Sequence, residues 1–244
     1  MARFKVFGGI NPANVAHADS VVVIGLGRFG QALALELMET GVDVLGIDAN
    51  EDIVQSLNGQ LTHVVQGDST REDTLRQLAV PEFDRAVVAI GTDIESSLLT
   101  TSLLLRFPIQ EIWAKAVSDA HGAILDQLGV HHVVYPEKDM GKRVAHLVRG
   151  RMQDYIEVGD DFALVKTSPP ADIIGKALGD TKVRARHGVT VAAVRPPGQP
   201  WTYATAETVL HAGDTILVTG SIQEAEAFGQ LASNHATRGG REKD

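Results

Sequence analysis

The residues VVVIGLGRFGQALALELMETGVDVLGID, 21–48, are the most informative part of this sequence about its fold. This stretch joins a short β-branched apolar run to a glycine-rich loop, a segment of helical period and a second apolar run. Short continuous apolar runs are typical of strands that are buried on both faces of a parallel sheet. The stretch therefore predicts a strand–helix–strand unit.

The same alternation continues to residue 137. The expected strands are SVVVIG (20–25), DVLGID (43–48), THVVQGD (62–68), RAVVAIG (85–91), EIWAKA (111–116) and HHVVYPE (131–137). Helical patterns between them run through Leu37 and then over 53–57, 73–78, 98–105 and 120–128. Strands that alternate with helices predict a doubly wound α/β fold, a Rossmann-like parallel sheet over residues 20–137.

The rest of the chain divides by composition. Residues 1–19 lack a period and form an N-terminal lead-in, whereas 138–153 carry a helical pattern that leads away from the sheet as a crossover helix. Strand-like runs such as GVTVAAVRPP and DTILVTG between Pro and Gly turns predict a smaller α+β C-terminal domain over 154–233. The polar residues 234–244 are expected to be a disordered tail.

Composition excludes several classes of protein. The 244 residues hold no cysteine, so disulfides, zinc–thiolate sites and thiol nucleophiles are excluded. No stretch is long and apolar enough for a membrane helix or a signal peptide, so we expect a cytoplasmic chain. A formal net charge of −9 disfavours nucleic acid as a partner.

The glycine loop matches the dinucleotide-binding pattern G-x-G-x-x-G in the required position between a strand and a helix. Gly25 permits the tight turn, Gly27 lets a pyrophosphate approach the backbone, and Gly30 allows close packing of the helix on the strand. Asp48 ends the second strand, where a carboxylate binds ribose hydroxyls and repels a 2′-phosphate. The alternative is a plain turn with Asp48 as a helix N-cap.

Arg28 in the loop could reach a terminal phosphate, or it could be a solvated side chain. Its neighbour Phe29 is also predicted to contact the ligand. Asp68 follows the third strand and could accept a hydrogen bond from the amine of adenine, with Ser69 beside it. Alternatively, DSTRED caps the next helix.

The fourth and fifth strands end at the same edge of the sheet. Gly91, Thr92 and Asp93 follow the fourth strand and should line the crevice, although Thr92 or Asp93 could instead cap a helix. Lys115, at the end of the fifth strand, either faces a phosphate or is solvated.

Catalytic groups are not evident in the sequence. The residues after the predicted nucleotide fold contain no Ser/His/Asp set and no metal-ligand spacing, and His131 and His132 adjoin a strand, where a structural role is the simpler interpretation. We therefore expect a binding protein rather than an enzyme.

The motifs GLGRFG, VLGID, RAVVAIGTDIESSLLTT, IWAKA and VVYPEKDMG resemble the RCK (KTN) regulatory subunits of bacterial Ktr/Trk potassium-uptake systems, from about Ser20 to Ala232. The resemblance implies a cytosolic gating subunit in which ATP favours the conducting state and ADP the inactive one. It also implies homodimers that assemble into a ring of eight subunits beneath a membrane-embedded channel or transporter subunit.

The resemblance also implies roles for individual residues. Arg28 would contact the γ-phosphate, Asp48 the ribose and Asp68 the adenine. Glu137 in PEKDMG would hold Mg²⁺ or Na⁺ near the phosphates; the residues alone suggest only an exposed acid beside Lys138.

The C-terminal segment DIIGKALGDTKVRARHGVTVAAV resembles the module that binds cyclic di-AMP in many members of the family. Ile174, Val183 and Arg184 are the candidate contacts, with Arg184 at a phosphate. The length of the segment between Ile174 and Val183 departs from the family pattern, and an apolar edge with solvated arginines is the alternative.

An NAD(H)-binding redox sensor or NAD-dependent oxidoreductase remains the rival interpretation, because the glycine loop and Asp48 suit NADH as well. Arg28 and Glu137 favour the gating subunit, since a triphosphate and its cation use both and a nicotinamide needs neither.

Overall fold

The structure is a computed structural model that describes residues 20–149 and 152–231. The predicted lead-in (1–19) and tail (234–244) lie outside the described residues. The chain forms two compact units, residues 1–137 and 138–244, and each is described by itself.

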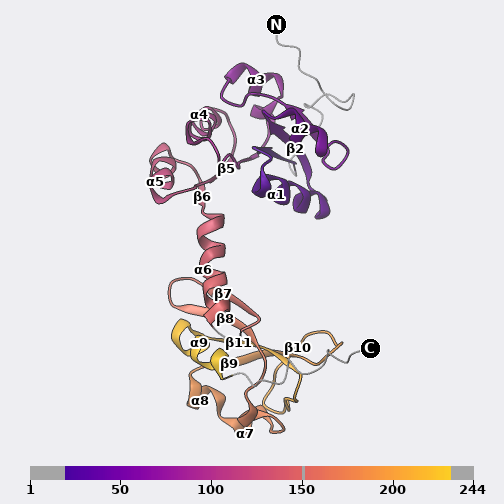
Figure 1. The fold of residues 1–244 in the computed structure, drawn as a ribbon, viewed down its shortest axis with the longest axis vertical. Helices are drawn as coiled ribbons and strands as arrows, with labels where there is room; N and C mark the ends of the chain where they lie inside the picture. Colours follow the sequence, from indigo (N-terminus) through magenta and orange to yellow (C-terminus); the bar gives the residue numbers. More distant parts are fainter. Residues whose placement is uncertain (1–19, 150–151, 232–244) are drawn as a thin grey trace, which may run out of the picture. The chain divides into compact units, whose positions relative to one another are not determined.

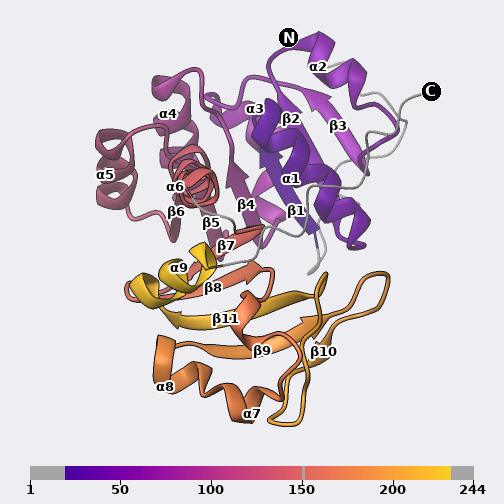
Figure 2. The ribbon, with the colours of Figure 1, turned by 60° about the horizontal axis from the view of Figure 1, so that its bottom comes forward.

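The first unit is built on a six-stranded parallel sheet in the order β3-β2-β1-β4-β5-β6. Figure 1 labels β2, β5 and β6 of this sheet, and Figure 2 labels all of its strands. Its strands are β1 (Ser20–Ile24), β2 (Asp43–Asp48), β3 (His63–Gln66), β4 (Arg85–Val88), β5 (Glu111–Lys115) and β6 (His132–Val134). Its helices are α1 (Arg28–Glu39), α2 (Glu51–Ser56), α3 (Glu72–Gln77), η2 (Val80–Glu82), α4 (Ile94–Leu104) and α5 (Asp119–Leu128). The predicted doubly wound fold is confirmed.

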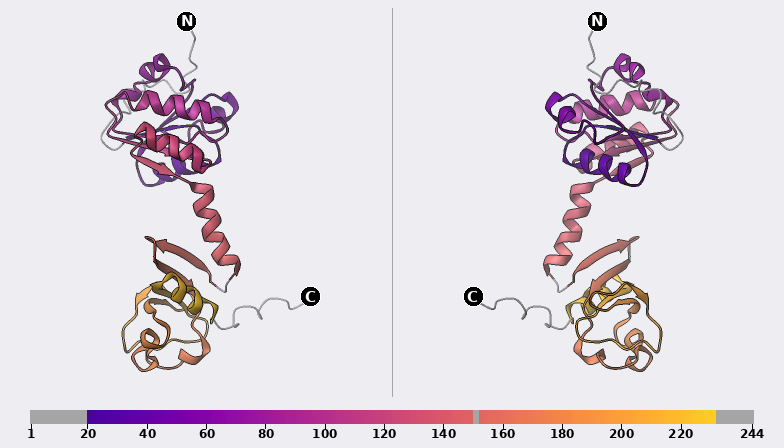
Figure 3. Two further views of the ribbon diagram at one scale, coloured as in Figure 1. Left: turned by 90° about the vertical axis from the view of Figure 1, so that its left-hand side faces the viewer. Right: turned by 90° about the vertical axis from the view of Figure 1, so that its right-hand side faces the viewer.

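Two apolar layers enclose this sheet. On one face, α1 and α2 pack through Ala34 and Val54 against alternate residues of β1 to β4. On the other face, Leu75 of α3, Leu104 of α4 and Leu125 of α5 join one core cluster with the remaining strand residues. Figure 3 shows α4 and α5 side by side on their face. The β-branched runs are continuous because both faces of each strand are covered.

The strand order reverses at β1, which pairs with β2 on one side and β4 on the other. The connections that leave these two neighbours run to opposite faces of the sheet, so the loops after the strands diverge and open a crevice. The candidate site residues of the first unit lie around this crevice, at the carboxyl edge of the sheet.

The second unit contains a five-stranded antiparallel sheet in the order β10-β9-β11-β8-β7, part of which Figure 2 shows strand by strand. Its strands are β7 (Asp154–Val158), β8 (Phe162–Thr167), β9 (Thr190–Arg195), β10 (Thr202–Tyr203) and β11 (Thr215–Ser221). Short helices η3 (Ala171–Ile173), α7 (Leu178–Thr181) and α8 (Val183–His187) precede β9, and α9 (Ile222–Gln230) follows β11.

The sequence pattern does not reveal the β7–β8 hairpin. Ile156, Val158 and Phe162 are apolar but 45%, 54% and 41% exposed, because they lie on the sheet face opposite the core. Apolar residues on both faces obscure the alternation that marks a one-sided strand.

Helix α6 (Pro136–Arg149) begins two residues before the predicted start, so it includes Glu137, and Figure 3 shows it as one continuous helix. Near its other end, His146 stacks on Tyr155 with ring centroids 4.0 Å apart. The two ring nitrogens of His146 face Glu226 of α9 and Glu157 of β7. These contacts hold the C-terminal end of α6 against β7 and α9 within the second unit.

No helix in the described residues is long and apolar enough to span a bilayer.

Candidate functional site

A cavity of about 740 Å³ lies at the carboxyl edge of the parallel sheet. Apart from Gly30, the residues predicted for the nucleotide site all line it: Gly25, Gly27, Arg28, Phe29, Asp48, Asp68, Ser69, Gly91, Thr92, Lys115 and Glu137. Residues at or just after the ends of β1, β2, β3, β4 and β5 thus converge on one cavity with Glu137 of α6, which is more than a hundred positions from Gly25.

The glycine loop has the geometry that its spacing predicts. Gly25 has φ +88°, a conformation that L side chains rarely adopt. A side chain on Gly30 would collide with the carbonyl oxygen of Gly25, so Gly30 packs beneath the loop rather than lining the cavity. Nothing lies within 4 Å of where a Cβ of Gly27 would be, which leaves open space for a ligand.

Gly27 is also the N-cap of α1 and provides no side-chain hydrogen bond, and the first turn of the helix holds no acidic residue. The free N–H groups and the positive end of α1 therefore face the cavity through Gly27 without a competing carboxylate. Such a helix end binds phosphate groups.

Asp48 connects the end of β2 to the glycine loop. Its carboxylate accepts the backbone N–H of Leu26 at 2.6 Å and that of Asn50 at 2.8 Å. Asn50, not Asp48, is the N-cap of α2, since its side chain accepts from Asp52. The alternative role of Asp48 as the helix cap is therefore wrong, and its remaining lone pairs can accept ribose hydroxyls.

Asp68 and Ser69 form the wall of the cavity that follows β3. Asp68 is exposed and closes a turn by accepting from the N–H and hydroxyl of Thr70. The following helix, α3, has Arg71 as its N-cap, so Asp68 does not cap it. Ser69 is buried, and its hydroxyl lies 2.8 Å from that of Thr100 on α4.

After β4, Asp93 rather than Thr92 is the N-cap of α4. Its hydrogen bonds from Ser96 hold the pKa of the Asp93 carboxyl below its usual value. Thr92 does not cap the helix. It is exposed and lines the cavity.

Lys115 and Glu137 form an ion pair at the β5 side of the cavity, with Nζ 2.6 Å from Oε1. The lysine is therefore not solvated: its side chain is only 9% exposed, whereas that of Glu137 is 66% exposed. The Lys115 hydrogen bond, together with the charges of Lys115 and Arg28, holds the pKa of Glu137 below its usual value. The ammonium also lies 5.6 Å from the centroid of the Phe29 ring.

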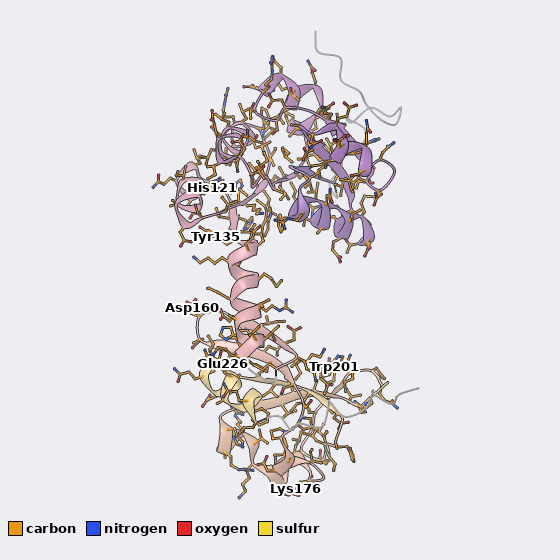
Figure 4. The ribbon with its side chains drawn as sticks, in the orientation of Figure 1. His121, Tyr135, Asp160, Lys176, Trp201 and Glu226 are labelled. Carbon is orange, nitrogen blue, oxygen red and sulfur yellow. The ribbon has the colours of Figure 1, made fainter. Side chains whose placement is uncertain are left out.

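The short sequence between β6 and α6 brings Glu137 to this position. Tyr135 packs its hydroxyl against Gly122 of α5, where a larger residue would collide with the phenol. Figure 4 labels Tyr135 just beyond β6 and His121 on α5. Pro136 then begins α6 with the backbone angle that a first helical residue needs, and Glu137 follows in the first turn.

Within the described residues, no group of three His, Asp, Glu or Cys side chains is placed to hold a metal ion. Glu137 alone still fits Mg²⁺ or Na⁺ beside a nucleotide, because Mg²⁺ is commonly bound by one or two carboxylates, with phosphate oxygens and water completing its shell.

The candidate contacts of the C-terminal domain differ in burial. Val183 is 5% exposed and belongs to the core of the second unit, so its side chain is not at the surface. Ile174 is half-buried and Arg184 is exposed on α8. Neighbouring Arg186 is engaged by Asp172 at 2.6 Å, which leaves Arg184 as the better placed arginine for a ligand.

Several residues that line the cavity were not expected. They are Ile24, Ile47, Ala49, Asn50, Ile53, Gly67, Thr70, Ala89, Ile90, Ser96 and Val117. Ile53 belongs to the apolar pattern of α2, and that pattern predicts a core residue. Only its position in the first turn, shortly after the strand that ends at Asp48, could have indicated that it lines the cavity.

The comparisons with known proteins agree with this architecture. Residues 21–136 match the TrkA-N domain and residues 162–233 match the TrkA-C domain. The chain is 37% identical to Ktr system potassium uptake protein C of Bacillus subtilis over 84% of this chain and 94% of the relative. It is 33% identical to protein A of the same system and organism, over 84% and 93%.

The fold is that of a solved structure, the GsuK RCK domain, with a TM-score of 0.61 at 18% identity. This match covers 91% of the chain and 49% of the solved one. The two domain matches identify a two-domain protein of the TrkA-N/TrkA-C class. The chain belongs to the family of Ktr potassium uptake proteins, and the resemblance drawn from its sequence is confirmed.

Proposed function

We propose that this chain is a cytoplasmic, nucleotide-sensing regulatory subunit of a Ktr-type potassium uptake system. The observation that carries the proposal is the convergence, in one cavity, of an uncapped helix N-terminus, the carboxylate of Asp48 and the Lys115–Glu137 pair. The names of the relatives, which the chain matches over more than nine-tenths of their length, support the potassium-uptake role.

The ligand proposed for the cavity is an adenine nucleotide. The adenine lies beside Asp68 and Ser69, the ribose hydroxyls bind Asp48, and the phosphates pass over Gly27 to the N-terminus of α1. A third phosphate extends toward Arg28 and the Lys115–Glu137 pair. Because only ATP carries that phosphate, these contacts distinguish it from ADP, and ATP favours the conducting state while ADP favours the inactive one.

Glu137 holds Mg²⁺ or Na⁺ at the phosphates, where the cation offsets their charge. Moving a two-state switch from 1:99 to 99:1 requires about 5.5 kcal/mol of differential binding. A single terminal-phosphate contact is worth less than this, so several coupled sites in an assembly must act together. We therefore include homodimers that form a ring, with eight subunits as the expected number, docked on a membrane-embedded potassium channel or transporter subunit.

The C-terminal domain is proposed to bind cyclic di-AMP as an inhibitor. Exposed Arg184 suits its phosphate and half-buried Ile174 suits its base, whereas Val183 supports this surface from the core. No catalytic step is part of the proposal.

Calorimetric titration of nucleotide-stripped protein with ATP, ADP and NADH, in one buffer with magnesium, tests the proposed ligand. Micromolar or tighter binding of ATP and ADP, with much weaker binding of NADH, is the expected result. Preferential binding of NADH would contradict the proposal and favour a redox sensor.

A further inference from the structure

The ion pair at the β5 side of the cavity is unequal in burial. Lys115 is enclosed, with 9% of its side chain exposed, whereas the carboxylate of Glu137 is 66% exposed. Removing an ammonium from water is costly unless an anion faces it. Among the described residues, Glu137 is the carboxylate that forms an ion pair with Lys115.

Glu137 therefore has two possible partners. Its Oε1 already binds the ammonium of Lys115 at 2.6 Å, and the same carboxylate is the proposed ligand of Mg²⁺ or Na⁺. An ammonium and a metal cation at one carboxylate repel each other at short range. A cation can bind well only when Lys115 turns to another anion.

The cavity has a place for a second anion and space in which the side chain of Lys115 can move. Lys115, Gly27 and Glu137 line the same cavity, so a phosphate at the N-terminus of α1 shares it with the ammonium. A Cβ on Gly91 would lie 3.2 Å from Nζ, so the missing side chain leaves space beside the ammonium.

We propose that the ammonium of Lys115 stays paired with the carboxylate of Glu137 until a nucleotide phosphate binds the ammonium. The carboxylate of Glu137, released from Lys115, then binds the cation. Lys115 is thus a positioning residue that makes cation binding follow nucleotide binding. This inference rests on the proposed function and adds an order of events to it.

The test measures Mn²⁺ binding to nucleotide-free protein by the electron paramagnetic resonance of free Mn²⁺. Lys115→Met removes the ammonium and keeps an apolar chain of similar length; it should bind Mn²⁺ about tenfold more tightly than the wild type. Lys142→Met, which changes an exposed lysine of α6, should leave the affinity unchanged. Adding Glu137→Gln to Lys115→Met should abolish the gain.

A gain in Mn²⁺ affinity that Glu137→Gln abolishes cannot arise from loss of structure, so it supports the proposal directly. Equal or weaker Mn²⁺ binding by a folded Lys115→Met protein, judged by its circular dichroism, would overturn it. If that variant does not fold, Lys115→Gln is measured under the same criteria. Wild-type protein that binds no ATP or ADP would instead overturn the proposed function, so the two failures are distinguishable.

Discussion

The carboxylate of Asp48 accepts the backbone N–H of Leu26, between two glycines of the loop, at 2.6 Å. This bond joins the ends of β1 and β2, 22 positions apart in sequence, and keeps the glycine loop in shape before any ligand arrives. The same carboxylate is the proposed ribose ligand, so one side chain supports both the loop and the nucleotide.

Asp48→Ala should weaken ADP binding at least tenfold. The change removes the proposed ribose contacts and leaves the N–H groups of Leu26 and Asn50 without their partner, and each lost hydrogen bond to a charged group is worth about 1.5–3 kcal/mol. Calorimetry measures the effect, with Glu39→Ala, an exposed acid at the end of α1, as control. Unchanged ADP affinity would contradict the assignment of the site.

Gly27→Ala should mainly weaken nucleotide binding, whereas Gly30→Ala should mainly destabilise the fold. A methyl group on Gly27 enters empty space at φ −66°, so stability should fall only by the poorer fit of Ala at an N-cap, up to about 1 kcal/mol, while nucleotide binding weakens. A methyl group on Gly30 meets the carbonyl of Gly25 and should destabilise the fold by about 1–3 kcal/mol. Urea unfolding and ADP titration of both variants separate a role in binding from one in packing; similar stability losses in both would refute the distinction.

Arg28→Ala should narrow the preference for ATP over ADP and retain ADP binding. The reason is that Arg28 is exposed at the mouth of the cavity, where the proposed third phosphate lies. The measurement is the ratio of the two dissociation constants, compared with that of Arg106→Ala, which changes an exposed arginine outside the cavity. An equal loss for both nucleotides would indicate a different phosphate geometry.

Tyr155 should make the protein less stable at alkaline pH. Burial raises the pKa of its phenol to about 12, and the nearby charges of Glu157 and Glu226 act in the same direction. Because the folded pKa exceeds the unfolded value of about 10, this stability is complete below pH 10 and is lost as the pH rises to 12.

At pH 11 the loss relative to pH 9 should be about 1.4 kcal/mol smaller in Tyr155→Phe than in the wild type. Urea unfolding at the two pH values measures it, and Tyr203→Phe, at a tyrosine that is 92% exposed, is the control. The same pH dependence in wild type and Tyr155→Phe would show that the pKa of the Tyr155 phenol is not raised in the folded protein.

The alternation of strands and helices over 20–137, the glycine loop and the position of Asp48 could all be predicted from the sequence alone. These features depend on local period and spacing, because buried parallel strands carry continuous apolar runs and a phosphate loop needs glycines at set positions. The β7–β8 hairpin could not be predicted from the sequence, since its exposed apolar residues leave no clear period.

The hydrogen-bond and ion-pair partners of the polar side chains could not be predicted from the sequence. Asn50 and Asp93 proved to be helix caps, Val183 a core residue, and Lys115 the buried partner of Glu137. Lys115 and Glu137 are 22 positions apart, and they meet only because β5 and β6 pair in parallel and Tyr135 packs on Gly122. Contacts of this kind depend on the packing of whole elements, which no local pattern encodes.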